Sequence, residues 1–105
     1  MPFLDTNALP AVEKRPGWRG RHFHSASMTF GHWEFAAGAW VHEHSHPQEE
    51  VWDVIDGELE VTVDGETAIA RPGVVAIVPP NAPHSLRALS DGRAIVVDHP
   101  LRPEF

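Results

Sequence analysis

Cysteine and tyrosine are both absent from this chain of 105 residues. Without cysteine, the protein can form no disulfide and can bind no metal through a thiolate. A chain without thiols suits a reducing compartment, and we therefore expect a cytoplasmic protein. Without tyrosine, no acid–base step can use a phenol as its proton donor or acceptor.

Positive charge and long apolar runs are also scarce. Eight Lys and Arg residues stand against 15 Asp and Glu residues, which leaves a formal charge of −7 with histidine neutral. Such a surface repels nucleic acid and anionic lipid, so we expect neither as a partner. No apolar run approaches the roughly 20 residues that a membrane span needs. The first 18 residues lack a basic patch followed by an apolar stretch, so we expect no signal peptide.

No segment shows a sustained helical period. Residues 1–24 are rich in proline and polar residues, and we expect them to form an irregular N-terminal arm. Residues 25–105 alternate between apolar and polar side chains and are divided by turn signals such as Asp64-Gly65. This pattern predicts one all-β domain, a sandwich or barrel, with strands at residues 25–35, 39–46, 50–55, 58–63, 67–71, 74–78, 84–89 and 93–98.

Histidine is abundant, with eight residues. Side chains two apart in a strand project to the same side, so His44 and His46 are predicted to lie together, with His42 on the same face. After Pro47, Glu50 can return its carboxylate toward the two imidazoles. Two imidazoles and one carboxylate leave open positions on a divalent metal. From spacing alone, a metal site and a metal-free, pH-sensitive histidine surface both stay open.

Two stretches around these histidines resemble the two motifs of the cupin family. The first runs from Gly38 to Gly57, and its spacing is glycine, five residues, His44, one residue, His46, three residues, Glu50, six residues, glycine. The second runs from Gly73 through Pro79 and Asn81 to His84. Asn81 stands where the family usually has glycine, and asparagine tolerates the left-handed backbone that this turn needs.

The resemblance implies a small, single-domain jelly-roll barrel of the cupin type. It implies one divalent transition metal (Fe, Mn, Ni or Zn) inside the barrel, with His44, His46, Glu50 and His84 as its ligands. It also implies a homodimer, since similar cupins pair through barrel edges and N-terminal strands. A barrel of this size has room for one small ligand.

The tail Val97–Phe105 resembles the tails of small cupins related to the pectin-degradation sugar cupins. In those proteins an aspartate near the end of the last strand handles protons beside the metal, which implies this role for Asp98. His42 is a second candidate for moving a proton. The side chains that we expect to line the cavity are Met28, Phe30, Trp33, Phe35, Trp40, Trp52, Val54 and Leu86.

Three functions follow as hypotheses. The first is a small-molecule enzyme in which the metal acts as a Lewis acid, with isomerase or lyase chemistry on sugars or uronates. The second is a metal-dependent dioxygenase, because open positions on Fe(II) also suit O₂. The third is a non-catalytic cupin that binds or senses a small ligand.

Overall fold

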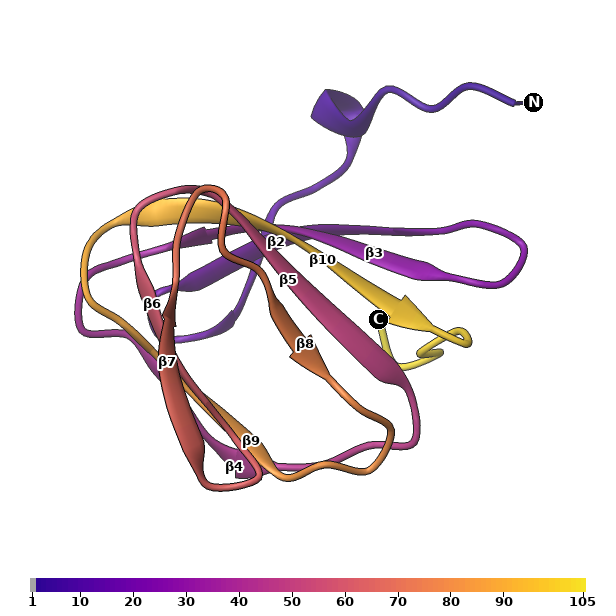
Figure 1. Cartoon of the computed structure of the whole chain (residues 1–105). Helices are drawn as coiled ribbons and strands as arrows, with labels where there is room; N and C mark the ends of the chain where they lie inside the picture. The colour runs from indigo at the N-terminus through magenta and orange to yellow at the C-terminus, as the bar shows by residue number, and fades with distance from the viewer. Residues whose placement is uncertain (1) are drawn as a thin grey trace.

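The computed structural model describes residues 2–105, and these form two antiparallel β-sheets that pack into a barrel (Figure 1). The six-stranded sheet has the order β1-β2-β3-β10-β5-β8, and the four-stranded sheet has the order β4-β9-β6-β7. The prediction of an all-β jelly-roll barrel is confirmed. The elements are η1 (Thr6–Ala8), β1 (Val12–Arg15), β2 (Trp18–His24), β3 (Thr29–Phe35), β4 (Trp40–His44), β5 (Glu49–Asp56), β6 (Leu59–Val63), β7 (Glu66–Ala70), β8 (Ala76–Val78), β9 (His84–Ala88) and β10 (Gly92–His99).

Strict alternation in β5 and β10 places their buried side chains opposite each other. Trp52 lies opposite Val96, and Val54 lies opposite Ala94. Because side chains in a strand alternate between faces, this register keeps the apolar residues of both strands inside the barrel. The same register sets Asp98 opposite Glu50, so two carboxyl groups meet at one end of the apolar interior.

The apolar core fills the space between the two sheets. Trp18 is central to it, and its ring makes an edge contact with the ring of Trp52 at a centroid distance of 5.9 Å. An arrangement of this kind adds about 0.5–1.5 kcal/mol to the stabilisation from burial. The buried residues of this cluster are Trp18, Phe35, Trp52, Val54, Leu59, Val61, Ala70, Leu86, Ala88, Ala94 and Val96.

Residues 2–24, the described part of the predicted arm 1–24, are more regular than the sequence predicts. Strands β1 and β2 lie within them, and β2 pairs with β3 from Trp18 opposite Phe35 to His24 opposite Thr29. The expectation of an irregular arm is therefore wrong for residues 12–15 and 18–24. Proline and charged residues obscure the alternating pattern of a strand there. Pairing with β3 stabilises an extended backbone that the local sequence alone does not indicate. The segment before β1 extends away from both sheets (Figure 1).

Replacing Leu59 by alanine is expected to lower the free energy of unfolding by about 2–5 kcal/mol, because Leu59 is 0% exposed and its loss leaves a cavity. Ile69 on β7 is a matched control, since this aliphatic side chain is 40% exposed. Its replacement by alanine should cost less than about 1 kcal/mol. Urea unfolding of both variants measures the difference, and equal losses would contradict the assignment of the core.

In residues 2–105 there is no helix long and apolar enough to cross a membrane.

Candidate metal centre

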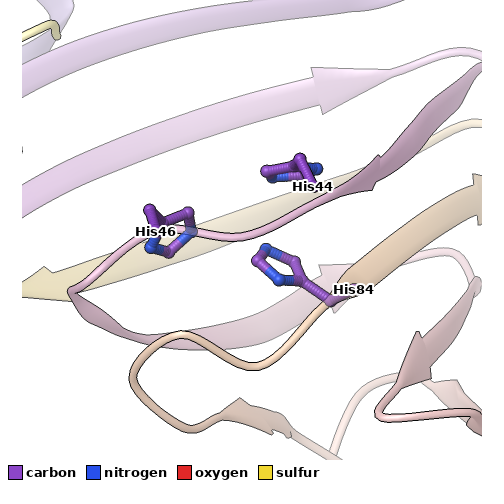
Figure 2. A group of neighbouring side chains, drawn as sticks. All are labelled: His44, His46 and His84. Atoms are coloured by element: carbon purple, nitrogen blue, oxygen red, sulfur yellow. The ribbon is translucent and has the colours of Figure 1, made fainter.

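Three histidine rings from two adjacent strands and the following turn converge at one end of the barrel. His44 ends β4, His84 begins β9, and the two residues are register partners. Their ring centroids are 4.2 Å apart, and the ring of His46 is 4.9 Å from that of His84. Figure 2 shows the three side chains gathered together. One nitrogen from each ring lies within 4.8 Å of the others, a spacing that can hold a metal ion.

The backbone determines which nitrogen each ring offers. The Nδ1 atoms of His44, His46 and His84 lie 2.8, 3.1 and 2.9 Å from the backbone carbonyls of His42, Gln48 and Ala82. A carbonyl can only accept, so each Nδ1 carries the proton and donates it. In the neutral ring each Nε2 then has a free lone pair, which is the form in which histidine binds a metal.

Glu50 adds a carboxylate to this cluster. Its Oε1 lies 3.5 Å from Nε2 of His46, and its Oε2 lies 3.2 Å from Nε2 of His84. Burial raises the pKa of Glu50, but its contacts with His46, His84, Asp98 and Trp52 outweigh burial and hold the pKa well below its usual range. At neutral pH the group is therefore a carboxylate, with Trp52 donating to Oε2 at 2.8 Å.

The geometry fits a bound cation. Within the described residues 2–105, the buried Nε2 atoms of His46 and His84 have no hydrogen-bond partner. Lone pairs that face a carboxylate repel it unless a proton or a metal ion lies between them. The raised pKa of His84 has this origin: burial lowers the pKa, but the Glu50 carboxylate and the Ala82 carbonyl raise it by more. Three nitrogens and one carboxylate are also a donor set that divalent first-row metals prefer.

Asp98 lies beside the cluster, as the cupin resemblance implies. It is 4% exposed, and it forms a second candidate metal-binding group with His46 and Glu50. Its Oδ1 atom is buried and has no hydrogen-bond partner among residues 2–105. Burial, followed by the charge of Glu50, raises the pKa of Asp98 to about 8. In the metal-free protein Asp98 therefore keeps its proton near neutral pH.

His42 lies outside the cluster, and the prediction that it shares a face with His44 is wrong. The pairing of β4 with β9 shifts register between Val41 and His44, which is the mark of a β-bulge. The extra residue brings Val41 and His44 to the inner side, while His42 is exposed. Its Nδ1 atom lies 3.2 Å from Nη1 of Arg15.

A cavity of about 360 Å³ lies beside the candidate metal centre, with His44, Glu50 and Asp98 in its lining. Of the predicted lining residues, Trp33, Trp52 and Leu86 line it, and Phe35 and Val54 pack into the core instead. Trp40 is 64% exposed, and Met28 and Phe30 do not line the cavity because Thr29 and Gly31 are the inward residues of β3. The full lining comprises Lys14, Arg15, Trp18, His22, Gly31, Trp33, Val41, His44, Glu50, Trp52, Leu86, Val96, Asp98, Arg102, Glu104 and Phe105.

Both ends of the chain contribute cavity walls that the sequence does not predict. His22 on β2 stacks on Phe105 at a centroid distance of 4.6 Å, and Arg102 places Nη1 3.3 Å from Oε1 of Glu50. The alternation of Trp18, Gly20 and His22 with basic residues was a signal for a strand here. The C-terminal contacts carried no such signal, because they depend on how the tail folds back.

His22 is expected to make folding stability sensitive to acid. Burial, followed by the charge of Lys14, lowers the pKa of His22 to about 4. Because the unfolded chain binds this proton at about 6.5, stability falls as the pH decreases from the unfolded value toward the folded one. A His22→Phe variant keeps the aromatic contacts and should lose less thermal stability than the parent between these pH values. Equal losses in melting temperature would contradict the assignment.

Comparison with known proteins identifies the family. The family model described as "Cupin domain" matches residues 31–100. The chain belongs to the cupin domain family. The prediction of a small cupin is thus confirmed, and the match contains the motif residues from Gly38 to His84.

A curated relative matches part of this cupin in sequence. It is 39% identical over 70 residues to polyketide synthase CurC of Streptomyces cyaneus, a match that covers 64% of this chain and 46% of that protein. The chain therefore spans less than half the length of this curated relative.

Two solved structures share the fold over nearly the whole length. An RmlC-like cupin from Shewanella frigidimarina has a TM-score of 0.92 at 24% identity, with 100% of this chain and 96% of the other covered. KdgF from Halomonas sp. has a TM-score of 0.90 at 23% identity, with 99% and 97% covered. At these identities the likeness concerns the fold, and the reaction has to be argued from the site.

Proposed function

We propose that this cupin is a metal-dependent enzyme of small molecules, with His44, His46, Glu50 and His84 as ligands of one divalent transition metal. The observation that carries the proposal is the convergence of three histidine rings, with one nitrogen of each within 4.8 Å of the others, and the contact of the Glu50 carboxylate with two of them. Isomerase or lyase chemistry on a sugar or uronate is the reaction class that we favour. Fe, Mn, Ni and Zn all accept this set of nitrogen and oxygen donors.

The metal and the residues around it have separate roles in such a reaction. When bound, the metal supplies a Lewis acid for a carbonyl or hydroxyl oxygen. Asp98 holds or accepts the proton at a carboxyl oxygen, since it is buried, lines the cavity and lies opposite Glu50. Trp52, Leu86 and Val96 form apolar walls that exclude water from the reacting group.

Elemental analysis of protein purified without added metal or affinity tags tests this proposal. We expect about one equivalent of a first-row metal, because the donor set has four strong ligands for ions of this class. Metal-free protein that also binds none of Fe(II), Mn(II), Ni(II) or Zn(II) on titration would refute it. The same analysis identifies the metal, which the ligand set leaves open.

The two alternative functions predict different results for the metal-loaded protein. A dioxygenase consumes O₂ when Fe(II)-loaded protein meets small diketones, thiols or phenols. A binding or sensing cupin holds a small ligand tightly and releases it unchanged. Oxygen uptake and product analysis on the same samples separate these outcomes from isomerase or lyase chemistry.

We also propose a cytoplasmic homodimer. The absence of cysteine supports the compartment. Exposed apolar side chains of the N-terminal segment support the dimer, since Phe3 is 86% exposed and Leu4 is 56% exposed. A partner subunit that covers such side chains removes apolar surface from water, and this favours the dimer.

A further inference from the structure

Two basic side chains of β1, Lys14 and Arg15, lie at the open side of the cavity. Both are exposed and line the cavity, whereas its deeper walls include buried residues such as Trp52 and Leu86. Strand β1 precedes the segment matched by the cupin domain family, which begins at residue 31. These two cations therefore lie outside the segment that the family model matches and outside its two metal-binding motifs.

Neither cation is neutralised within the described residues 2–105. The three carboxyl groups that line the cavity all contact Arg102: Glu50 at 3.3 Å, Asp98 at 3.7 Å and Glu104 at 2.7 Å. Lys14 and Arg15 form no salt bridge within 4.0 Å. The protein has a formal net charge of −7, so two cations without a salt bridge beside one cavity make the local charge there unlike that of the whole protein.

Both cations are held in place by uncharged partners. Nη1 of Arg15 donates to Nδ1 of His42 at 3.2 Å, so this contact orients the guanidinium without cancelling its charge. The bulge in β4 leaves His42 on the exposed side, where it meets Arg15 of β1. Nζ of Lys14 lies 5.1 Å from the centroid of the Phe105 ring. A cation held over an aromatic face remains free to bind an anion on its other side.

The charge of the cavity favours an anionic ligand once the metal is present. Its lining holds three basic side chains and three carboxyl groups, and their formal charges cancel when all are ionised. A divalent ion therefore leaves an excess of two positive charges. A cavity with charge of one sign and apolar walls concentrates the field and attracts the opposite charge.

We propose that Lys14 and Arg15 bind the anionic group, a carboxylate or a phosphate, of a small ligand whose oxygen-bearing end reaches the metal centre. His42 is a positioning residue for Arg15. The inference rests on the proposed function, because the metal centre defines the far end of the ligand. It adds selection of an acidic over a neutral substrate. The residues that would make this selection, Lys14 and Arg15, lie outside the motifs that supply the metal ligands.

Isothermal titration calorimetry with three six-carbon probes tests the inference: sorbitol, gluconate and sorbitol 6-phosphate. The probes share hydroxyl oxygens that can reach a metal, and they differ in a neutral, carboxylate or phosphate end. We expect at least one anion to bind more tightly than sorbitol, and its identity names the group. This preference should shrink as ionic strength rises from about 0.01 M to about 0.15 M.

Five single variants then assign the preference to named side chains. Lys14→Gln and Arg15→Gln should each raise the Kd of the preferred anion by about three- to tenfold, the range of exposed to partly desolvated charged contacts. Arg71→Gln makes the same charge change at an exposed position outside the cavity lining, and it should leave this Kd unchanged. His42→Ala should weaken anion binding, and His42→Asn should restore it because the amide oxygen replaces Nδ1 as acceptor.

Two results would overturn the inference. One is the absence of any preference for gluconate or sorbitol 6-phosphate over sorbitol. The other is a preference that survives in the Lys14→Gln/Arg15→Gln double variant. Metal content, measured on every sample, separates this failure from that of the proposed function. A full equivalent of metal without anion preference refutes the cationic pair alone, whereas protein that binds no metal refutes the metal-dependent function.

Discussion

Replacing His84 by alanine is expected to leave the purified protein with far less than one equivalent of metal. His84 is 1% exposed, and its buried Nε2 atom has no hydrogen-bond partner in the part of the chain that the structure describes. The substitution removes a ligand, so it should cost more than the roughly 10- to 100-fold loss of affinity caused by removing an outer partner. Elemental analysis and a competition titration with a chelator measure the change.

Two further variants make the result specific. His44→Ala removes the register partner of His84 and should have the same effect on metal content. His32→Ala is the matched control: His32 lies on the outer face of β3, where its ring contacts Phe23, and its loss should leave bound metal unchanged. Full metal content in both His84→Ala and His44→Ala would show that the metal centre is assigned wrongly.

Asp98→Asn is expected to abolish most turnover while leaving metal bound. The amide has nearly the shape of the carboxyl group but cannot accept and return a proton. Loss of a positioned general acid or base costs about 10²- to 10⁴-fold in kcat. The measurement is kcat of the metal-loaded variant on any substrate that the parent converts, together with its metal content.

The control for Asp98 comes from the neighbouring strand. Asp53 lies on the exposed face of β5, opposite Ile95, and Asp53→Asn makes the same chemical change far from the cavity lining. It should retain the kcat of the parent. If Asp98→Asn also turns over at the rate of the parent, then Asp98 moves no proton in the reaction and the acid–base group lies elsewhere.

Arg102 explains how two carboxyl groups can share this buried end of the barrel. Its guanidinium contacts Glu50, Asp98 and Glu104, and the backbone amide of Arg102 donates to Oγ1 of Thr29 at 2.9 Å. The contact with Glu50 partly offsets the cost of burying that carboxylate. The tail therefore belongs to the structure of the site, and in Figure 1 it folds back beside the ends of β3 and β10.

Much of the fold and of the proposed ligand set could be predicted because the relevant signals are local. Alternation in β5 and β6 and the Asp64-Gly65 turn predict strands directly, since side chains two apart share a face. The spacing of His44, His46 and Glu50 brings them near one another with a single turn between two strands. A single strand pairing, that of β4 with β9, then brings His84 next to His44.

Tertiary structure decided the surroundings of this cluster, because they depend on pairing between distant segments. The pairing of β10 with β5 set Asp98 opposite Glu50, and the bulge in β4 turned His42 away from the cavity and toward Arg15. A bulge inserts one residue without changing local composition, so alternation counted back from His44 misplaces His42 at the bulge. The sequence by itself thus determined the barrel and the group of candidate ligands. The walls and charge of the cavity were decided by long-range strand pairing and by the fold of the tail.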